Sequence, residues 1–99
     1  MMVGLARVTD AEHIDGRVLR IEFTDGLVRE LDFTGVLAGY LASIDDDAVF
    51  SSVAVDSMTG TICWPTGIDL DPDVLRGETP ASSAGHARLV REYRLQSAG

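Results

Sequence analysis

The chain lacks a second cysteine, a long apolar run and an excess of basic residues. Its single cysteine, Cys63, cannot form a disulfide within the chain, which agrees with a reducing compartment. No apolar run approaches the roughly 20 residues that span a bilayer, and residues 1–7 lack a basic stretch followed by a long apolar segment. We therefore expect a cytoplasmic protein without a membrane segment.

Lysine is absent altogether: eight arginines stand against 16 Asp and Glu residues, so the formal net charge is −8. Such a molecule repels phosphate as a whole, whereas nonspecific nucleic-acid binding depends on clustered Lys and Arg. Only Arg88, Arg91 and Arg94 form a local basic group, near the C-terminus. We expect an acidic body with a mildly basic tail, and we do not expect nucleic acid as its main partner.

What the chain does have is enough apolar material for one small core. Its 99 residues are 45% hydrophobic and 24% charged, so a compact domain is expected and wholesale disorder is not. We place a single α+β domain at residues 1–79 and a linker with a short helix or mobile tail at residues 80–99.

Turn signals divide the first third of the chain into strands. Asp15-Gly16 lies between the strand-like runs 7–14 and 17–23, and Asp-Gly in such a setting is a strong hairpin signal. Residues 27–33 alternate apolar and polar side chains, which predicts a third strand.

The side-chain pattern also selects the length of the second turn. A two-residue loop at Asp25-Gly26 would place carboxylates beside apolar residues, which is costly. A three-residue loop, Thr24-Asp25-Gly26, with Gly26 in the left-handed region, avoids this. The longer loop pairs Phe23 with Leu27, Leu19 with Leu31 and Arg20 with Glu30, and it leaves Arg29 opposite Ile21, in need of solvent or a carboxylate.

The middle of the chain predicts short helical segments. Thr34 is a candidate N-cap for a weak helix over residues 35–41, with Tyr40 on its apolar face. The run Asp45-Asp46-Asp47 suits a capped turn that delivers Phe50 to the core. A metal site there is disfavoured, because three adjacent side chains diverge too much to converge on one ion.

A further hairpin is expected at residues 52–56 and 61–64, with Val55 paired to Ile62 and Val53 to Trp64. Pro65 then ends the strand, because it has no backbone donor. Asp71 is expected to cap a short helix that starts at Pro72 and stops at Gly77.

The C-terminal segment admits two interpretations. Residues 80–85 have the composition of a linker, and residues 86–96 form either a helix with Leu89, Val90 and Tyr93 on one stripe or a mobile tail that folds on a partner. The expected fold is therefore a small single α+β domain of about five strands in antiparallel hairpins, one or two short helices packed on the sheet, and a C-terminal helix as an option.

Two motifs carry a family resemblance. Phe-x-Asp-Gly stands at residues 23–26, and Trp-x-x-Gly-x-Asp-Leu-x-Pro-x-x-Leu stands at residues 64–75, with Asp32 and Phe50 in order between them. Over residues 5–76 the chain resembles the bacterial family called domain of unknown function 2442. The resemblance implies a small bacterial α+β domain with no established reaction. It also implies a place in two-protein systems resembling toxin and antitoxin pairs.

Candidate catalytic groups fail simple tests. Ser82, Ser83 and His86 lie in an expected linker, where nothing rigid holds a nucleophile against a base, and the strand-like setting of Cys63 favours a small buried hydrophobe. The acidic run 69–73 lacks the glycine and the terminal glutamate of a calcium loop. We expect no enzymatic activity, no catalytic residue, no metal site and no cofactor.

Binding is the remaining class of function. Trp64 and Pro65 are candidate recognition residues, although packing of Trp64 against the core beside Val53 is the favoured interpretation. The leading hypothesis is a protein-interaction or regulatory module with a protein partner, and self-association remains an alternative. The second hypothesis is an accessory transcriptional regulator that contacts nucleic acid through Arg88, Arg91 and Arg94 on one helical face.

Overall fold

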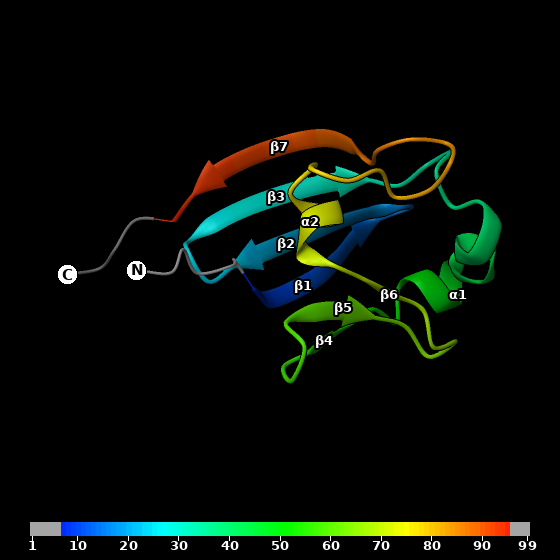
Figure 1. The fold of residues 1–99 in the computed structure, drawn as a ribbon, viewed down its shortest axis with the longest axis horizontal. Helices are drawn as coiled ribbons and strands as arrows, with labels where there is room; N and C mark the ends of the chain where they lie inside the picture. Colours follow the sequence, from blue (N-terminus) through cyan, green and yellow to red (C-terminus); the bar gives the residue numbers. More distant parts are fainter. Residues whose placement is uncertain (1–6, 96–99) are drawn as a thin grey trace.

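The structure, a computed structural model, describes residues 7–95 (Figure 1). Four strands form an antiparallel sheet in the order β1-β2-β3-β7, and three form a second sheet in the order β4-β5-β6. The strands are β1 (Val8–Asp15), β2 (Val18–Phe23), β3 (Leu27–Asp32), β4 (Ala54–Asp56), β5 (Thr61–Cys63), β6 (Asp69–Leu70) and β7 (Arg88–Arg94), and the helices are η1 (Gly39–Ile44), α1 (Asp47–Phe50) and α2 (Pro72–Leu75). The predicted α+β class is confirmed, with β6 and β7 added to the five expected strands.

The β1–β2 hairpin forms where the Asp-Gly signal predicts it, with its turn displaced by one residue. Asp15 pairs with Val18, so the turn consists of Gly16 and Arg17. Gly16 has a φ of 49°, in the left-handed region that glycine enters without steric cost. A register shift between His13 and Asp15 accompanies the displacement.

The register of β2 and β3 is the one that the sequence predicts. Leu19 pairs with Leu31, Arg20 with Glu30 and Ile21 with Arg29. The loop is Thr24-Asp25-Gly26, and Gly26 has a φ of 85°. The Asp25 Oδ1 accepts a hydrogen bond from the backbone of Leu27 at 3.2 Å, which closes the loop. The three-residue loop is therefore confirmed.

The helix predicted at residues 35–41 is wrong. Thr34 donates its amide and its hydroxyl to Asp32 Oδ1, at 2.9 and 2.6 Å, and it caps no helix. Gly35 has a φ of 83°, in the left-handed region, so a right-handed helix does not start there, and the 3-10 helix η1 begins only at Gly39. Tyr40, expected on an apolar face, is 63% exposed.

The capped turn before Phe50 is confirmed. The Asp46 side chain accepts a hydrogen bond from the backbone of Val49 at 3.1 Å and so caps α1. Phe50, at the end of α1, is fully buried. At α2 the predicted position is correct, with Asp71 at the N-cap and Pro72 first in the helix, but the Asp71 side chain makes no capping hydrogen bond.

The second sheet contains the predicted pair Val55 and Ile62. After β5, a turn at Pro65 to Gly67 reverses the chain, closed by a 3.0 Å bond from the Gly67 amide to the Trp64 carbonyl. The two residues of β6 then pair with β5. A two-residue strand has no alternation of its own, which is why the sequence pattern did not reveal it.

Of the two alternatives given for residues 86–96, a helix or a mobile tail, the helix is wrong, because residues 88–94 form strand β7. β7 pairs antiparallel with β3, with Glu30 opposite Arg91 and Asp32 opposite Arg88. An isolated helix of about 11 residues is marginal in water, whereas the strand gains the hydrogen bonds of the open β3 edge. Residues 96–99 of the predicted tail lie outside the described residues.

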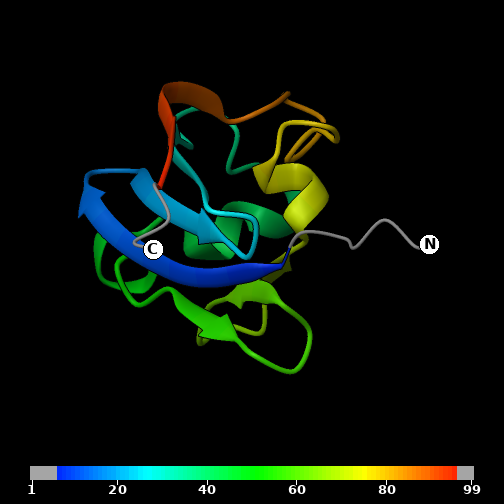
Figure 2. The same ribbon diagram turned by 90° about the vertical axis from the view of Figure 1, so that its left-hand side faces the viewer.

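One hydrophobic core joins the two sheets and the helices. The β4–β5 hairpin lies beside β1, β7 lies on the opposite side of the molecule, and α2 covers one face of the four-stranded sheet (Figures 1 and 2). The largest fully buried side chains come from both sheets and from η1, α1 and α2: Phe23, Phe33, Phe50, Leu19, Ile21, Leu31, Leu41, Ile44, Ile62, Leu70, Leu75 and Val28. No side chain of β7 belongs to this core.

Candidate functional site

Strand β7 is the most exposed regular element of the described chain and forms one edge of the four-stranded sheet (Figure 1). Six of its seven residues are exposed, and only Tyr93 is half-buried. Within residues 7–95, no strand pairs with the side of β7 that faces away from β3. An unpaired strand edge presents backbone donors and acceptors to any chain that approaches.

The backbone of β7 directs specific amides toward that edge. The Leu95 amide donates to the Gly26 carbonyl at 2.8 Å. Because N–H directions alternate along an antiparallel strand, the amides of Arg94 and Glu92 point away from β3 and those of Tyr93 and Arg91 toward it. A register shift between Glu30 and Leu31 makes Val90 the extra residue of a bulge.

Three large apolar side chains are exposed along this edge. Leu89, Val90 and Leu95 are 44%, 45% and 44% exposed. They are half of the large hydrophobic residues that are exposed in the described chain, the others being Ile14, Tyr40 and Met58. Leu89 and Val90 lie in β7 and Leu95 follows it directly, and because the ladder places Leu89 and Leu95 on opposite faces of the sheet, the apolar side chains flank the backbone edge on both faces.

The three C-terminal arginines lie along β7 and do not form a helical face. Pairing with β3 and the bulge at Val90 put Arg88 and Arg91 on one face of the sheet, beside Asp32 and Glu30, and Arg94 on the other face. Each arginine contacts a carboxylate of β3 or of the β2–β3 loop: Arg88 with Asp32 at 3.0 Å, Arg91 with Glu30 at 3.7 Å and Arg94 with Asp25 at 3.8 Å. The charges that suggested nucleic-acid binding therefore also attach β7 to its own sheet.

Tyr93 anchors the middle of β7 on the face away from α2. Arg91 lies over the Tyr93 ring, with 4.8 Å from the guanidinium carbon to the ring centroid. The Tyr93 hydroxyl accepts a hydrogen bond from Arg20 Nε at 3.3 Å. Val28, opposite Tyr93 in the ladder, is fully buried beneath this cluster.

Arg29 and Glu92 form an ion pair across β3 and β7 on the face covered by α2. The Arg29 side chain is 14% exposed, and its Nε is buried without a hydrogen-bond partner among the described residues. A Cβ atom at Gly77, just beyond α2, would lie 3.2 Å from Arg29 Nη2. The carboxylate that the register of β3 required for Arg29 is thus Glu92. Sequence reasoning missed it because it placed Glu92 in a helix or a mobile tail.

Asp25 joins α2, the β2–β3 loop and β7. It accepts two hydrogen bonds from Arg76, at 3.1 and 3.0 Å, and contacts Arg94. The Arg76 hydrogen bonds, followed by the Leu27 amide and the charge of Arg94, hold the pKa of Asp25 below its ordinary value against the opposing effect of burial.

Asp32 plays the same part at the other end of β7. The Thr34 hydroxyl, then the Thr34 amide and Arg88, lower the pKa of Asp32, and burial opposes them. Two carboxylates that favour the charged form therefore hold the first and last arginine of the strand.

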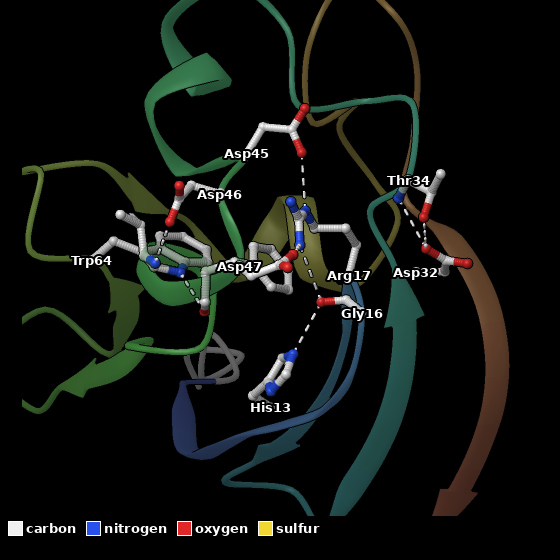
Figure 3. A network of polar contacts seen from close by, with 11 residues as sticks. His13, Gly16, Arg17, Asp32, Thr34, Asp45, Asp46, Asp47 and Trp64 are labelled. Atoms are coloured by element: carbon white, nitrogen blue, oxygen red, sulfur yellow. Dashed lines mark hydrogen bonds and ion pairs between the residues drawn. The ribbon is translucent and has the colours of Figure 1, made fainter.

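Trp64 and Pro65, the other predicted binding residues, lie apart from β7. Trp64 is 4% exposed and stacks on Phe50, with 5.9 Å between ring centroids. Its Nε1 donates to the Phe50 carbonyl at 3.0 Å (Figure 3). The structure thus places the indole in the core, while Pro65 is exposed in the turn after β5. The pair presents only the proline ring to solvent.

A second polar cluster surrounds the β1–β2 turn (Figure 3). Arg17 Nε binds Asp45 at 2.9 Å and its Nη1 binds Asp47 at 2.8 Å. His13 Nε2 lies 3.0 Å from the Gly16 carbonyl. Beside them is a shallow hollow of about 330 Å³, lined by His13, Asp15, Gly16 and Asp47. Arg17 already binds two of the three adjacent aspartates, and Asp46 caps α1, so the cluster is satisfied internally.

The residues considered for catalysis make other contacts. Ser82 Oγ accepts a hydrogen bond from the Ala84 amide at 3.0 Å, His86 is exposed, and Cys63 is half-buried in β5. Among residues 7–95 no three His, Cys, Asp or Glu side chains converge as metal ligands would. Within the same residues, no helix has the length and apolar character needed to cross a membrane.

Comparison with protein families shows a match over most of the chain. The family model described as Protein of unknown function (DUF2442) matches residues 8–81, which run from β1 past α2 and stop before β7. No curated protein and no solved structure gives a significant match.

Proposed function

The chain belongs to the DUF2442 family, whose function is unknown, and from this premise we propose that it is a non-enzymatic protein-interaction module that binds a protein partner at the open edge of β7. It would act as a regulatory component of a two-protein pair in the bacterial cytoplasm. The family resemblance supports the pairing, because it implies two-protein systems resembling toxin and antitoxin.

One observation carries this proposal: within residues 7–95, β7 combines exposed apolar side chains with a backbone edge that no other strand pairs with. Seven residues of strand are available for pairing, and Leu89, Val90 and Leu95 are each more than two-fifths exposed. Extended segments of partner proteins commonly add to such edges, because main-chain hydrogen bonds supply affinity and alternate side chains supply specificity. The remaining candidates, Trp64 and the Arg17 cluster, are buried or satisfied by their neighbours.

The regulator that contacts nucleic acid gains no support from the geometry. Its three arginines each contact a carboxylate. Nucleic acid would extend beyond β7 and meet the repulsion of a molecule of net charge −8.

Capture from the native host under mild crosslinking tests the proposal. We expect the wild-type chain to retain a stoichiometric protein partner and Val90→Asp to lose it, because Val90 is an exposed apolar residue of this edge strand. Met58→Asp is the matched control, since Met58 is 89% exposed and lies in the β4–β5 turn. The proposal is wrong if the wild-type chain retains no partner or if Val90→Asp retains it as well as Met58→Asp does.

A further inference from the structure

We propose that the partner contributes an extended, acidic peptide strand that pairs with β7 and becomes the fifth strand of the four-stranded sheet. This inference rests on the proposed function and adds the chemistry of the partner. It is carried by three features of β7: the direction of its free amides, its local charge and the exposure of its arginines.

The backbone of β7 is ready for strand addition. The Leu95 amide is bonded to Gly26 of the neighbouring loop, so the alternating amides of Arg94 and Glu92 face outward. These two donors, with the carbonyls of the same residues, form the hydrogen-bonding sites of the next antiparallel strand. An incoming segment therefore finds part of a regular ladder already aligned.

The charge of β7 then determines which peptide strands can pair with it. β7 carries three arginines and one glutamate, a net charge of +2 in a protein of net charge −8. The side chains of Arg88, Arg91 and Arg94 are 69%, 65% and 59% exposed. Opposite charges directly across two strands stabilise the pair and like charges destabilise it. A strand with Glu or Asp at alternate positions fits this edge, and a strand with Lys or Arg does not.

The ion pairs within the sheet leave the arginines able to bind further carboxylates. Among the described residues, each of the three reaches its carboxylate through one terminal nitrogen: Arg88 through Nη2, Arg91 through Nη1 and Arg94 through Nη1. A guanidinium group has five N–H donors. Each arginine therefore has N–H donors left for a second carboxylate while it keeps its contact with Asp32, Glu30 or Asp25.

A second copy of this chain is a poor occupant. Pairing β7 with β7 brings two segments of charge +2 together. The acidic strand at the other edge of the sheet, β1, lies against β4, and its Val8 amide donates to the Gly60 carbonyl at 3.0 Å (Figure 2). We therefore expect the partner strand to come from another protein.

Arginines and a bulge on an edge strand have an alternative explanation: they serve only to prevent aggregation through edge-to-edge strand pairing. The two explanations differ in one measurable property, which is the selectivity of β7 between acidic and basic peptide strands. A protected edge binds no strand, whereas a docking edge binds an acidic strand in preference to a basic one.

Fluorescence polarisation with the full chain measures this selectivity. The probe is a labelled eight-residue peptide that alternates Glu with Thr or Val, and the matched peptide carries Lys at each Glu position. We expect the Glu peptide to bind at least ten-fold more tightly than the Lys peptide at low salt, with the difference shrinking as ionic strength rises. Equal affinity of the two peptides, or no binding of the Glu peptide, overturns the inference.

Backbone pairing is tested separately from charge. In an extended peptide, alternate amides point toward β7 and away from it. N-methylation of the amides that point toward β7 should abolish binding of the Glu peptide, whereas N-methylation of the amides that point away should preserve it. In the protein, Arg94→Pro should abolish binding and Arg94→Ala should weaken it only a few-fold, because proline removes an amide that faces away from β3 and is tolerated at such edge positions. Binding that survives both changes shows a site that is not strand addition.

Failure of this inference and failure of the proposed function give different results. If capture from the host is lost with Val90→Asp but the Glu peptide does not bind, the interaction module stands and the acidic strand is wrong. If the wild-type chain captures no partner, the proposed function itself is wrong.

Discussion

At the scale of single residues, Arg29 is the clearest case in which a sequence pattern anticipates a need without showing how it is met. Pairing of β2 with β3 places Arg29 opposite Ile21, on a face that α2 covers. A cation in that position requires a carboxylate. The partner, Glu92, comes from β7, 63 residues further along the chain. When β7 pairs with β3, it therefore also supplies the carboxylate that neutralises Arg29.

Glu92→Gln should lower the free energy of unfolding by about 1 to 3 kcal/mol, because it leaves the Arg29 guanidinium, 14% exposed, without its counter-charge. A buried pair broken on one side costs more, but the Glu92 side chain is 40% exposed and solvent reduces the effect. Urea unfolding followed by circular dichroism measures the change.

The control for this prediction is a double-mutant cycle with Arg29→Met, which keeps much of the aliphatic stem. Removing both charges should cost less than the sum of the single changes, by about 1 kcal/mol or more. Additive effects of the two substitutions would show that the ion pair contributes nothing to stability.

At the scale of elements, the sequence predicts what local pattern determines and misses what a neighbour determines. The β2–β3 register follows from alternating side chains and from Gly26, all within one hairpin. β7 does not follow, because Leu89, Val90 and Tyr93 fit a helical stripe as well as they fit a strand. The open edge of β3 decides between the two, and that edge is not local to residues 88–94.

The same distinction applies to the candidate site. The arginines of β7 are visible in the sequence as a basic group. The sequence pattern placed them on one face of a helix, whereas they lie on a strand. The exposed apolar edge was not predictable, because a helix would have turned Leu89 and Val90 toward a core. Trp64 shows the reverse, since alternation along residues 61–64 correctly favoured burial.

Gly26 gives a prediction at the level of a hairpin. Gly26→Ala should destabilise the protein by about 1 to 2 kcal/mol, because φ at this position is 85° and a Cβ is disfavoured there. Crowding does not add to the cost, since the nearest atom to such a Cβ is the Leu95 carbonyl oxygen at 3.6 Å. Gly26→Asn is the control and should cost less, because asparagine enters this region more readily. Urea midpoints in the reverse order would contradict the assigned loop.

At the scale of the whole molecule, charge is distributed unevenly. A chain of net charge −8 carries its basic strand at one edge of the sheet, and carboxylates at both ends of that strand hold it in place. Asp25 contacts the last arginine of β7 and Asp32 contacts the first. Protonation of these two groups therefore acts on the proposed binding edge and on global stability together.

The pH dependence of stability follows from the lowered pKa values of Asp25 and Asp32. Because each carboxyl holds its proton less tightly in the folded state than in the unfolded chain, its contribution is complete above the unfolded pKa of about 3.9 and is lost as pH falls through the folded pKa. We expect the double variant Asp25→Asn/Asp32→Asn to be less stable than wild type at pH 7, and the gap to narrow steadily below about pH 4. Met58→Ala, at an exposed site without a charge, should keep a constant gap over the same range. Urea unfolding at a series of pH values measures both, and a gap for the double variant that stays constant or widens in acid would show that these carboxylates do not hold β7 through their charge.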